Sequence, residues 1–237
     1  MASPSAASVS VHRPATKISK WPGPALPRSR AQSRSTERTA PPLSPGHHVK
    51  IAVFCGSNFG KSDVYRRAAE ALGVALAEQR AELVFGGTNK GLMKVIADAV
   101  LGGGGTAHGI VPRGLVDKGQ QYPNLTRAEI VKTRSERKRR MAEAADGFIA
   151  MPGGVGTVEE LFEMWVDAQF DGHRKAIGLL NVDGFFNALM AFIDTMIEQG
   201  FLPPQHRDMI IVESDPRALL AALQTFVPVT ASKWIQQ

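Results

Sequence analysis

The sequence predicts an α/β fold in which a Rossmann-like parallel sheet carries helices on both faces and forms a single domain. Short apolar segments alternate with segments of helical spacing from about residue 49 onward. The expected strands are apolar at consecutive positions, which is typical of a parallel sheet covered on both sides. Three of these strands run directly into glycine, at Gly56, at Gly86-Gly87 and at Gly153-Gly154. Ligands bind at this carboxyl edge of open α/β sheets, so these turns predict a binding crevice.

Each element in this series is predicted from the pattern of its residues. Residues 49–55 form an apolar run that predicts the first strand, and Tyr65, Ala69, Leu72 and Leu76 then repeat at helical spacing. The strands that follow are expected, in chain order, at residues 83–85, 108–111, 130–131, 147–151, 176–180 and 209–212. The helices, of which the third is strongly basic, are expected at residues 63–79, 92–100, 135–145, 158–170, 185–199 and 216–226.

Residues 1–48 differ in composition from the rest of the chain. They are rich in Ser, Pro, Ala and Arg and show no sustained hydrophobic period. Such a segment cannot bury enough apolar surface to offset its ordering entropy, so we expect a disordered basic extension. Its composition also resembles an organellar transit peptide, although a plain extension or an upstream start codon is the preferred interpretation. The Rossmann-like domain is expected over residues 49–230, followed by a tail at 231–237.

The formal net charge of +6 does not indicate a nucleic-acid partner. Residues 1–50 carry eight Lys and Arg against one acid, whereas residues 51–237 carry 20 bases against 21 acids. The folded part is therefore close to neutral, unlike a domain that binds polyanions. No apolar stretch approaches the roughly 20 residues of a membrane-spanning helix, so no membrane contact is expected.

The single cysteine, Cys55, excludes a disulfide framework within the chain and a multi-thiolate zinc site. The histidines show no pair at the helical spacing of metal ligands, so no metal site is expected. A reducing compartment fits this composition, and we expect the cytoplasm, with organellar targeting by the basic extension as the alternative. Residues 55–62 resemble a phosphate-binding loop, but their glycine spacing is one residue short, which argues against a nucleoside triphosphatase of that class.

The most informative motif is Met-Pro-Gly-Gly-Val-Gly-Thr-Val-Glu-Glu at residues 151–160, between a buried strand and a helix. Glycines expose backbone N–H groups, and the start of a helix carries a partial positive charge, so together they can hold a phosphate. The residues expected to bind it, which we call the anion cradle, are Gly153, Gly154, Val155, Gly156 and Thr157. A capping box of Thr157 with Glu160 is the structural alternative, but it leaves the preceding glycines unexplained.

A second motif, Ser-Glu-Arg-Lys-Arg-Arg at residues 135–140, begins the basic helix. A solvated basic face is a sufficient explanation for Arg139 and Arg140. Arg137 and Lys138 lie at the start of the helix that leads into the strand before the anion cradle. We therefore expect Arg137 and Lys138 to point back toward the same crevice.

These segments together resemble the LOG ("Lonely Guy") family of cytokinin-activating phosphoribohydrolases, long mislabelled as lysine decarboxylases. The family hallmark Pro-Gly-Gly-x-Gly-Thr-x-x-Glu stands at residues 152–160, and its Arg-Lys pair is Arg137-Lys138, with Arg137 23 residues before Glu160. Three shorter matches, Val-Phe-Cys-Gly-Ser, Gly-Leu-Met and Gly-Leu-Leu-Asn, stand at residues 53–57, 91–93 and 178–181. The resemblance extends from about Lys50 to Pro228.

The resemblance implies hydrolysis of the N-glycosidic bond of a nucleoside 5′-monophosphate, a cytokinin riboside monophosphate or AMP, to free base and ribose 5-phosphate. It implies that Arg137 and Glu160 are catalytic and that Lys138 adds charge near the phosphate. The other substrate-binding residues expected outside the anion cradle are Gly56, Ser57, Gly87 and Met93. No cofactor is implied, and the family forms homodimers with active sites near the interface.

Several positions depart from the pattern of the close family, so the accepted base stays open. Gly119 stands where a glutamate usually contacts the nucleotide, Arg134-Ser135 replaces Met-His, and Val166 replaces a threonine. These departures motivate an alternative function, a non-catalytic carrier of a nucleotide-like ligand or of the molybdenum cofactor. Retention of Arg137 and Glu160 argues against a pure carrier. A pyridoxal-phosphate decarboxylase is the weakest alternative, because no lysine has a recognisable cofactor context.

Overall fold

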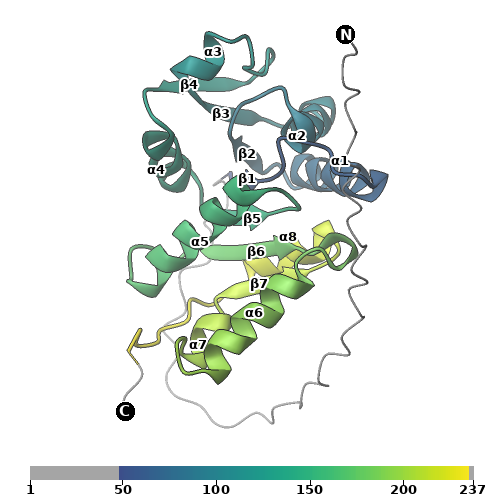
Figure 1. Ribbon diagram of the computed structural model, residues 1–237. Coiled ribbons are helices and arrows are strands. Elements are labelled where there is room, and N and C mark those ends of the chain that lie inside the picture. The colour runs from purple at the N-terminus through teal and green to yellow at the C-terminus, as the bar shows by residue number, and fades with distance from the viewer. Residues whose placement is uncertain (1–47, 235–237) are drawn as a thin grey trace, which may run out of the picture. The chain divides into compact units, whose positions relative to one another are not determined.

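A computed structural model describes residues 48–234, which fold around one sheet of seven parallel strands (Figure 1). The strands are β1 (Lys50–Phe54), β2 (Glu82–Phe85), β3 (Ala107–Pro112), β4 (Arg127–Val131), β5 (Gly147–Ala150), β6 (Ala176–Leu180) and β7 (Ile210–Glu213). Their spatial order is β4-β3-β2-β1-β5-β6-β7, and every neighbouring pair is parallel. The predicted fold class is confirmed.

Helices cover both faces of this sheet (Figure 1). The helices on one face are α1 (Asp63–Glu78), α2 (Gly91–Gly102) and α8 (Pro216–Gln224). Those on the other face are α4 (Arg134–Ala144), α5 (Val155–Gln169) and α6 (Asn187–Glu198). Three one-turn segments complete the described residues: α3 (Arg113–Val116), η1 (Val182–Gly184) and α7 (Pro204–Arg207).

The two core layers explain why the strands are apolar at consecutive positions. Successive side chains of a strand point to opposite faces of the sheet. In β1, Ile51 and Val53 pack with α1, α2 and α8, whereas Ala52 and Phe54 pack with α4, α5 and α6. All four side chains are buried, so neither face of the strand can carry a polar residue.

The strand order reverses at β1, and this reversal places the candidate site. The chain moves outward from β1 through β2 and β3 to β4, then returns to the other side of β1 to form β5, β6 and β7. A crevice opens at such a switch point, beyond the carboxyl ends of the two strands. Here the N–H of Gly56 after β1 donates to the carbonyl of Pro152 after β5 at 3.1 Å, so the two turns are joined at the crevice.

The start of α5 differs from the prediction. The helix begins at Val155, three residues before the expected start, and its N-cap is Gly154. Because Thr157 is then the third residue of the helix and not its N-cap, the capping box of Thr157 with Glu160 is wrong. Instead, the Thr157 N–H donates to the carbonyl of Gly154 at 3.0 Å, and the glycine run itself forms the first turn.

Some elements were not predicted, and some predictions concern residues that the structure does not describe. The segments α3, η1 and α7 were not expected, because a single turn contains too few residues to show a period. Predictions for residues 1–47 fall outside the described residues, and the domain boundaries stay predictions. Within residues 48–234, every helix is too short or too polar to cross a membrane.

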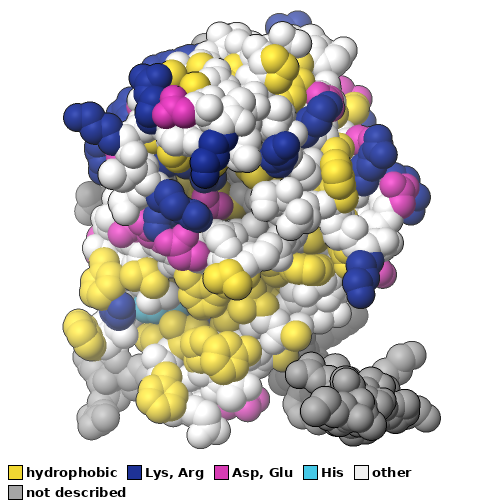
Figure 2. Space-filling view, turned by 45° about the horizontal axis from the view of Figure 1, so that its top comes forward, with side chains coloured by type: hydrophobic (Ala, Val, Ile, Leu, Met, Phe, Trp, Pro, Cys, Tyr) yellow, Lys and Arg dark blue, Asp and Glu magenta, His cyan; other side chains and the backbone are white. Residues whose placement is uncertain are grey.

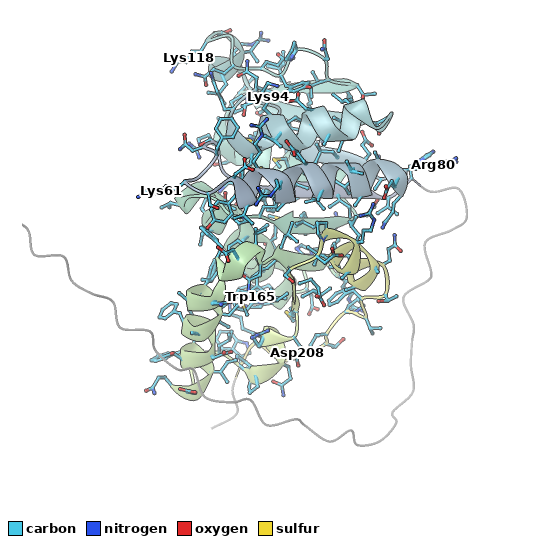
Figure 3. All side chains as sticks on the ribbon, turned by 90° about the vertical axis from the view of Figure 1, so that its right-hand side faces the viewer. Lys61, Arg80, Lys94, Lys118, Trp165 and Asp208 are labelled. Atoms are coloured by element: carbon cyan, nitrogen blue, oxygen red, sulfur yellow. The ribbon has the colours of Figure 1, made fainter. Side chains whose placement is uncertain are left out.

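α1 and α2 lie side by side over the sheet (Figure 3). In that view Lys61 and Arg80 mark the two ends of the α1 region, and Lys94 marks α2. Gly73 of α1 faces α2 at this contact. A Cβ at Gly73 would lie 2.6 Å from the Cβ of Ala99 and 2.8 Å from the carbonyl oxygen of Ile96. The missing side chain therefore sets how closely the two helices pack.

We expect Gly73→Ala to lower the free energy of unfolding by about 1–3 kcal/mol, because the added methyl forces the two helices apart. The cost of this clash outweighs the ~1 kcal/mol by which alanine is favoured over glycine within a helix. Gly102→Ala is the matched control in α2, where nothing lies within 4 Å of the added Cβ. Urea unfolding followed by circular dichroism compares the variants, and a Gly73→Ala protein as stable as wild type would contradict the close contact.

Candidate active site

The carboxyl end of β1, the start of α2 and the first turns of α4 and α5 border a cavity of about 270 Å³. Most of the predicted site residues line it, namely Ser57, Met93, Arg137, Gly154, Val155, Gly156, Thr157 and Glu160. Figure 2 shows a hollow near the middle of this face, with Lys and Arg side chains around its upper part and acidic side chains beside it. The switch point of the sheet therefore carries a concave, charged site.

A buried ion pair forms the floor of this cavity. The Nη2 of Arg137 donates to Oε1 of Glu160 at 3.0 Å, and the two side chains are only 14% and 12% exposed. Burial raises the pKa of the Glu160 carboxyl above its usual range, while the positive charge of Arg137 opposes this shift. Arg137 is the largest of the nearby positive charges that lower this pKa, and Arg134 and Lys138 contribute less in the same direction.

Glycine at the end of β2 allows Arg137 to reach Glu160. A Cβ at Gly86 would lie 2.5 Å from Nη2 of Arg137 and 3.2 Å from Sδ of Met93. Any side chain at this position would therefore push the guanidinium away from its place. The Nε of Arg137 is buried without a hydrogen-bond acceptor among the described residues, so one donor stays available to a ligand.

The anion cradle has two kinds of glycine. A Cβ at Gly153 would lie 2.2 Å from Oγ1 of Thr157, so glycine is required there by packing. A Cβ at Gly154 would meet nothing within 4 Å, so its absence leaves open space at the cavity. The N–H groups of Val155 and Gly156 in the first turn of α5 have no acceptor within the helix. These donors, at the positive end of the helix, suit an anion such as a phosphate.

A second cavity of about 170 Å³ lies on the other side of the cradle. It shares Ser57 and Gly154 with the first cavity, and Gly56 also lines it. Its remaining walls are largely apolar and include Tyr65 and Phe185, whose rings meet edge to face with centroids 5.8 Å apart. An apolar or planar group attached to a bound anion would find contact surface in this second cavity.

Gly56 and Gly153 line only the second cavity, and two predicted site residues, Lys138 and Gly87, line neither cavity. Lys138 forms ion pairs with Glu159 and Glu163 of α5 and contributes nothing to the cavity wall. Gly87 has a positive φ of 66°, and a Cβ there would lie 2.4 Å from Cγ2 of Val111, so the turn and its packing explain this glycine.

Sequence reasoning missed the third charged residue that lines the cavity, Arg134. It precedes Arg137 by three positions, and residues three apart share one face of a helix. That spacing would have grouped Arg134 with Arg137 and excluded the adjacent Lys138. The other departures from the family pattern, Gly119, Ser135 and Val166, line neither of the two cavities.

Metal and thiol chemistry have no support at this site. Among residues 48–234 there is no group of three or more His, Cys, Asp and Glu side chains that could hold a metal ion. Cys55 lines the cavity, but burial, with a further contribution from Glu160, raises the pKa of its thiol. The thiol therefore stays protonated and is a poor nucleophile.

Comparison with known proteins gives both a matching family and close relatives. The family described as "Possible lysine decarboxylase" matches residues 93–223. The probable cytokinin riboside 5′-monophosphate phosphoribohydrolase LOGL9 of Oryza sativa subsp. japonica is 39% identical over 210 residues, which cover 87% of this chain and 92% of that protein. The cytokinin riboside 5′-monophosphate phosphoribohydrolase LOG7 of Arabidopsis thaliana is 41% identical over 179 residues, which cover 76% and 82%.

Solved structures share the fold at lower identity. The molybdenum cofactor binding protein of Rippkaea orientalis aligns with a TM-score of 0.60 and 19% identity, covering 76% of this chain and 98% of that chain. The Moco carrier protein of Chlamydomonas reinhardtii aligns with a TM-score of 0.55 and 20% identity, covering 75% and 96%. These structures support the architecture, whereas the relatives at about 40% identity confirm the resemblance carried by residues 152–160. The chain belongs to the LOG family, the cytokinin riboside 5′-monophosphate phosphoribohydrolases.

Proposed function

We propose that this chain hydrolyses the N-glycosidic bond of a nucleoside 5′-monophosphate, a cytokinin riboside monophosphate or AMP, and releases the free base and ribose 5-phosphate. The observation that carries this proposal is the buried Arg137–Glu160 pair, which faces the same cavity as the first turn of α5. One cavity thus offers an anion-binding helix end and, beside it, a carboxylate. A phosphorylated sugar needs both groups when the bond at its C1′ is broken.

The chemistry follows from where these charges lie. Departure of the base leaves oxocarbenium character at C1′, as in glycoside hydrolysis generally. The Glu160 carboxylate stabilises this cation and orients or deprotonates the attacking water. The water oxygen bonds to C1′ while the C1′–N bond breaks. The base leaves with the bonding electrons and takes up the proton that the attacking water loses.

The positions along α5 keep the phosphate and the carboxylate apart. The free N–H groups belong to Val155 and Gly156, whereas Glu160 is the sixth residue of the helix. Arg137 holds the Glu160 carboxylate at 3.0 Å, so this side chain does not turn back toward the helix end. The phosphate can therefore occupy the first turn while Glu160 faces the sugar.

The carrier alternative has no specific observation in its favour. The proteins whose names mention the molybdenum cofactor are only 18–20% identical to this chain, a likeness that concerns the fold. A carrier also has no need of a desolvated carboxylate held by an arginine, because burying that pair costs free energy without adding to ligand affinity.

We also propose a homodimer, which forms through the apolar surface of α5 and α6. Large hydrophobic side chains are exposed there: Val166 by 41%, Phe170 by 58% and Phe192 by 58%. Figure 2 shows hydrophobic side chains gathered on the lower half of the face, below the hollow. Exposed apolar patches of this kind are typical of protein interfaces. The cytoplasm remains the proposed compartment, since the single cysteine fits a reducing environment.

Glu160→Gln is expected to lower kcat for base release by about 10²–10⁴-fold, the usual contribution of a positioned acid or base. KM for AMP should change little, because the phosphate contacts are intact. Chromatography of released base from AMP and from isopentenyladenosine monophosphate measures the effect. Glu159→Gln, an exposed neighbour on the same helix, is the control. Full activity of Glu160→Gln would end the assigned role of Glu160.

Arg137→Met is expected to move the acid limb of the kcat/KM profile to higher pH. Arg137 lowers the pKa of Glu160, so its loss raises that pKa, and the carboxylate becomes protonated at a higher pH. Arg137→Lys keeps a cation and should shift the limb less. The substrate phosphate titrates equally in all three proteins, so the difference between profiles isolates Glu160. An unshifted acid limb in Arg137→Met would show that Glu160 does not control it.

The dimer is tested by the mass in solution. Wild type should sediment as a dimer, and Phe192→Asp should shift the equilibrium toward the monomer by placing a charge in the apolar surface. Val74→Asp, an exposed apolar residue of α1 on the opposite face of the sheet, should leave the mass unchanged. A wild-type monomer in analytical ultracentrifugation would rule out the proposed assembly.

A further inference from the structure

Arg134 differs from the other basic residues of α4 in having no acidic partner. The other four each pair with a carboxylate: Arg137 with Glu160, Lys138 with Glu159 and Glu163, Arg139 with Glu143, and Arg140 with Glu129 and Glu143. Within residues 48–234, no carboxylate lies within ion-pair distance of the Arg134 guanidinium, although α4 and α5 together are rich in acids. The charge of Arg134 is therefore not used to hold the fold together.

The start of α4 fixes where Arg134 lies. Thr133 is the N-cap, and its Oγ1 accepts a hydrogen bond from the N–H of Glu136 at 3.0 Å. The Glu136 carboxylate in turn accepts from the N–H of Lys132 at 2.8 Å. These reciprocal bonds resemble a capping box and hold the first turn of the helix in place. Arg134, the first helical residue, is thereby directed to the cavity, whose wall it forms with Arg137.

The Arg134 guanidinium lies beside the anion cradle. A Cβ added to Gly156 would be 3.9 Å from Nη2 of Arg134, which places this nitrogen over the first turn of α5. The unpaired N–H groups of that turn and the guanidinium thus border the same space. Glu160 lies near enough to interact electrostatically with Arg134, but its hydrogen bond is with Arg137 and it forms no ion pair with Arg134. The space between Arg134 and the start of α5 is left with positive charge and hydrogen-bond donors, and without a competing acceptor.

We propose that Arg134 binds the 5′-phosphate of the substrate by clamping it against the first turn of α5. The planar guanidinium can donate two parallel hydrogen bonds to phosphate oxygens, while the helix supplies backbone donors from the other side. Arg134 then makes the enzyme select a phosphorylated nucleoside over the nucleoside itself. Lys138, which is bound to Glu159 and Glu163, takes no part in this contact. The inference rests on the proposed function for the nature of the substrate.

The first test is the affinity for ribose 5-phosphate, measured by calorimetry without any turnover. Arg134→Met should weaken binding by about 10–100-fold, the effect of losing a charge-assisted hydrogen-bond pair. Arg134→Lys should restore part of the affinity, because lysine supplies the charge without the planar fork. Arg139→Met is the control, since Arg139 lies on the same helix and pairs with Glu143. Equal affinity of wild type and Arg134→Met, or no binding by wild type, would overturn the inference.

The second test uses base release and separates the inference from the proposed function. For AMP, Arg134→Met should raise KM by a similar factor and change kcat little, whereas slow release from adenosine should be unaffected. Equal losses with AMP and adenosine would show a structural role and overturn the inference. If wild type binds ribose 5-phosphate through Arg134 but releases no base from any monophosphate, the phosphate site stands and the proposed hydrolase activity fails.

Discussion

The candidate site depends on the desolvated contact between Arg137 and Glu160. A buried charge is costly unless an opposite charge is held against it with good geometry, so the two helices that carry these residues must be placed within tight limits. β1 and β5 supply that placement, because their carboxyl ends are joined by the bond from the Gly56 N–H to the Pro152 carbonyl. The strand order reverses at this point, and both α4 and α5 start from the carboxyl edge of the sheet. The position of one carboxylate thus follows from the connectivity of the whole sheet.

Glycine serves this contact in two different ways. At Gly86 and Gly153 a side chain would collide with a group of the site, the Arg137 guanidinium in one case and the Thr157 hydroxyl in the other. At Gly154 no collision would occur, and the missing side chain instead keeps the cavity open. A run of glycine weakens local backbone stability. This cost falls where the backbone borders the two cavities, and the apolar layers on both faces of the sheet supply the stability of the fold.

The hydrophobic pattern of the sequence was enough to predict the strands and the long helices. A strand buried on both faces of the sheet leaves a continuous apolar run, and a helix buried on one face leaves apolar residues at helical spacing. The predicted start of a helix was less accurate where backbone geometry, and not a side chain, determines the first helical residue. α5 begins inside the glycine run, where no side chain marks the N-cap. The motif correctly brought Arg137 and Glu160 to one cavity but grouped Lys138 with them, since adjacent residues look equivalent in a motif. On a helix they point about 100° apart, and Arg134 takes the place expected of Lys138.

The separation of binding from chemistry explains how the accepted base can vary while the reaction stays the same. In the proposed reaction, the groups assigned to the phosphate are the backbone of α5 and Arg134, and those assigned to C1′ are Arg137 and Glu160. All of them line one cavity and are placed by the fold itself. Selection of the base then falls to surfaces farther out, such as the aromatic second cavity. Val166 departs from the family pattern, lies outside both cavities and is exposed on the face proposed for the dimer. This departure therefore concerns the surface proposed for assembly and not the wall of either cavity.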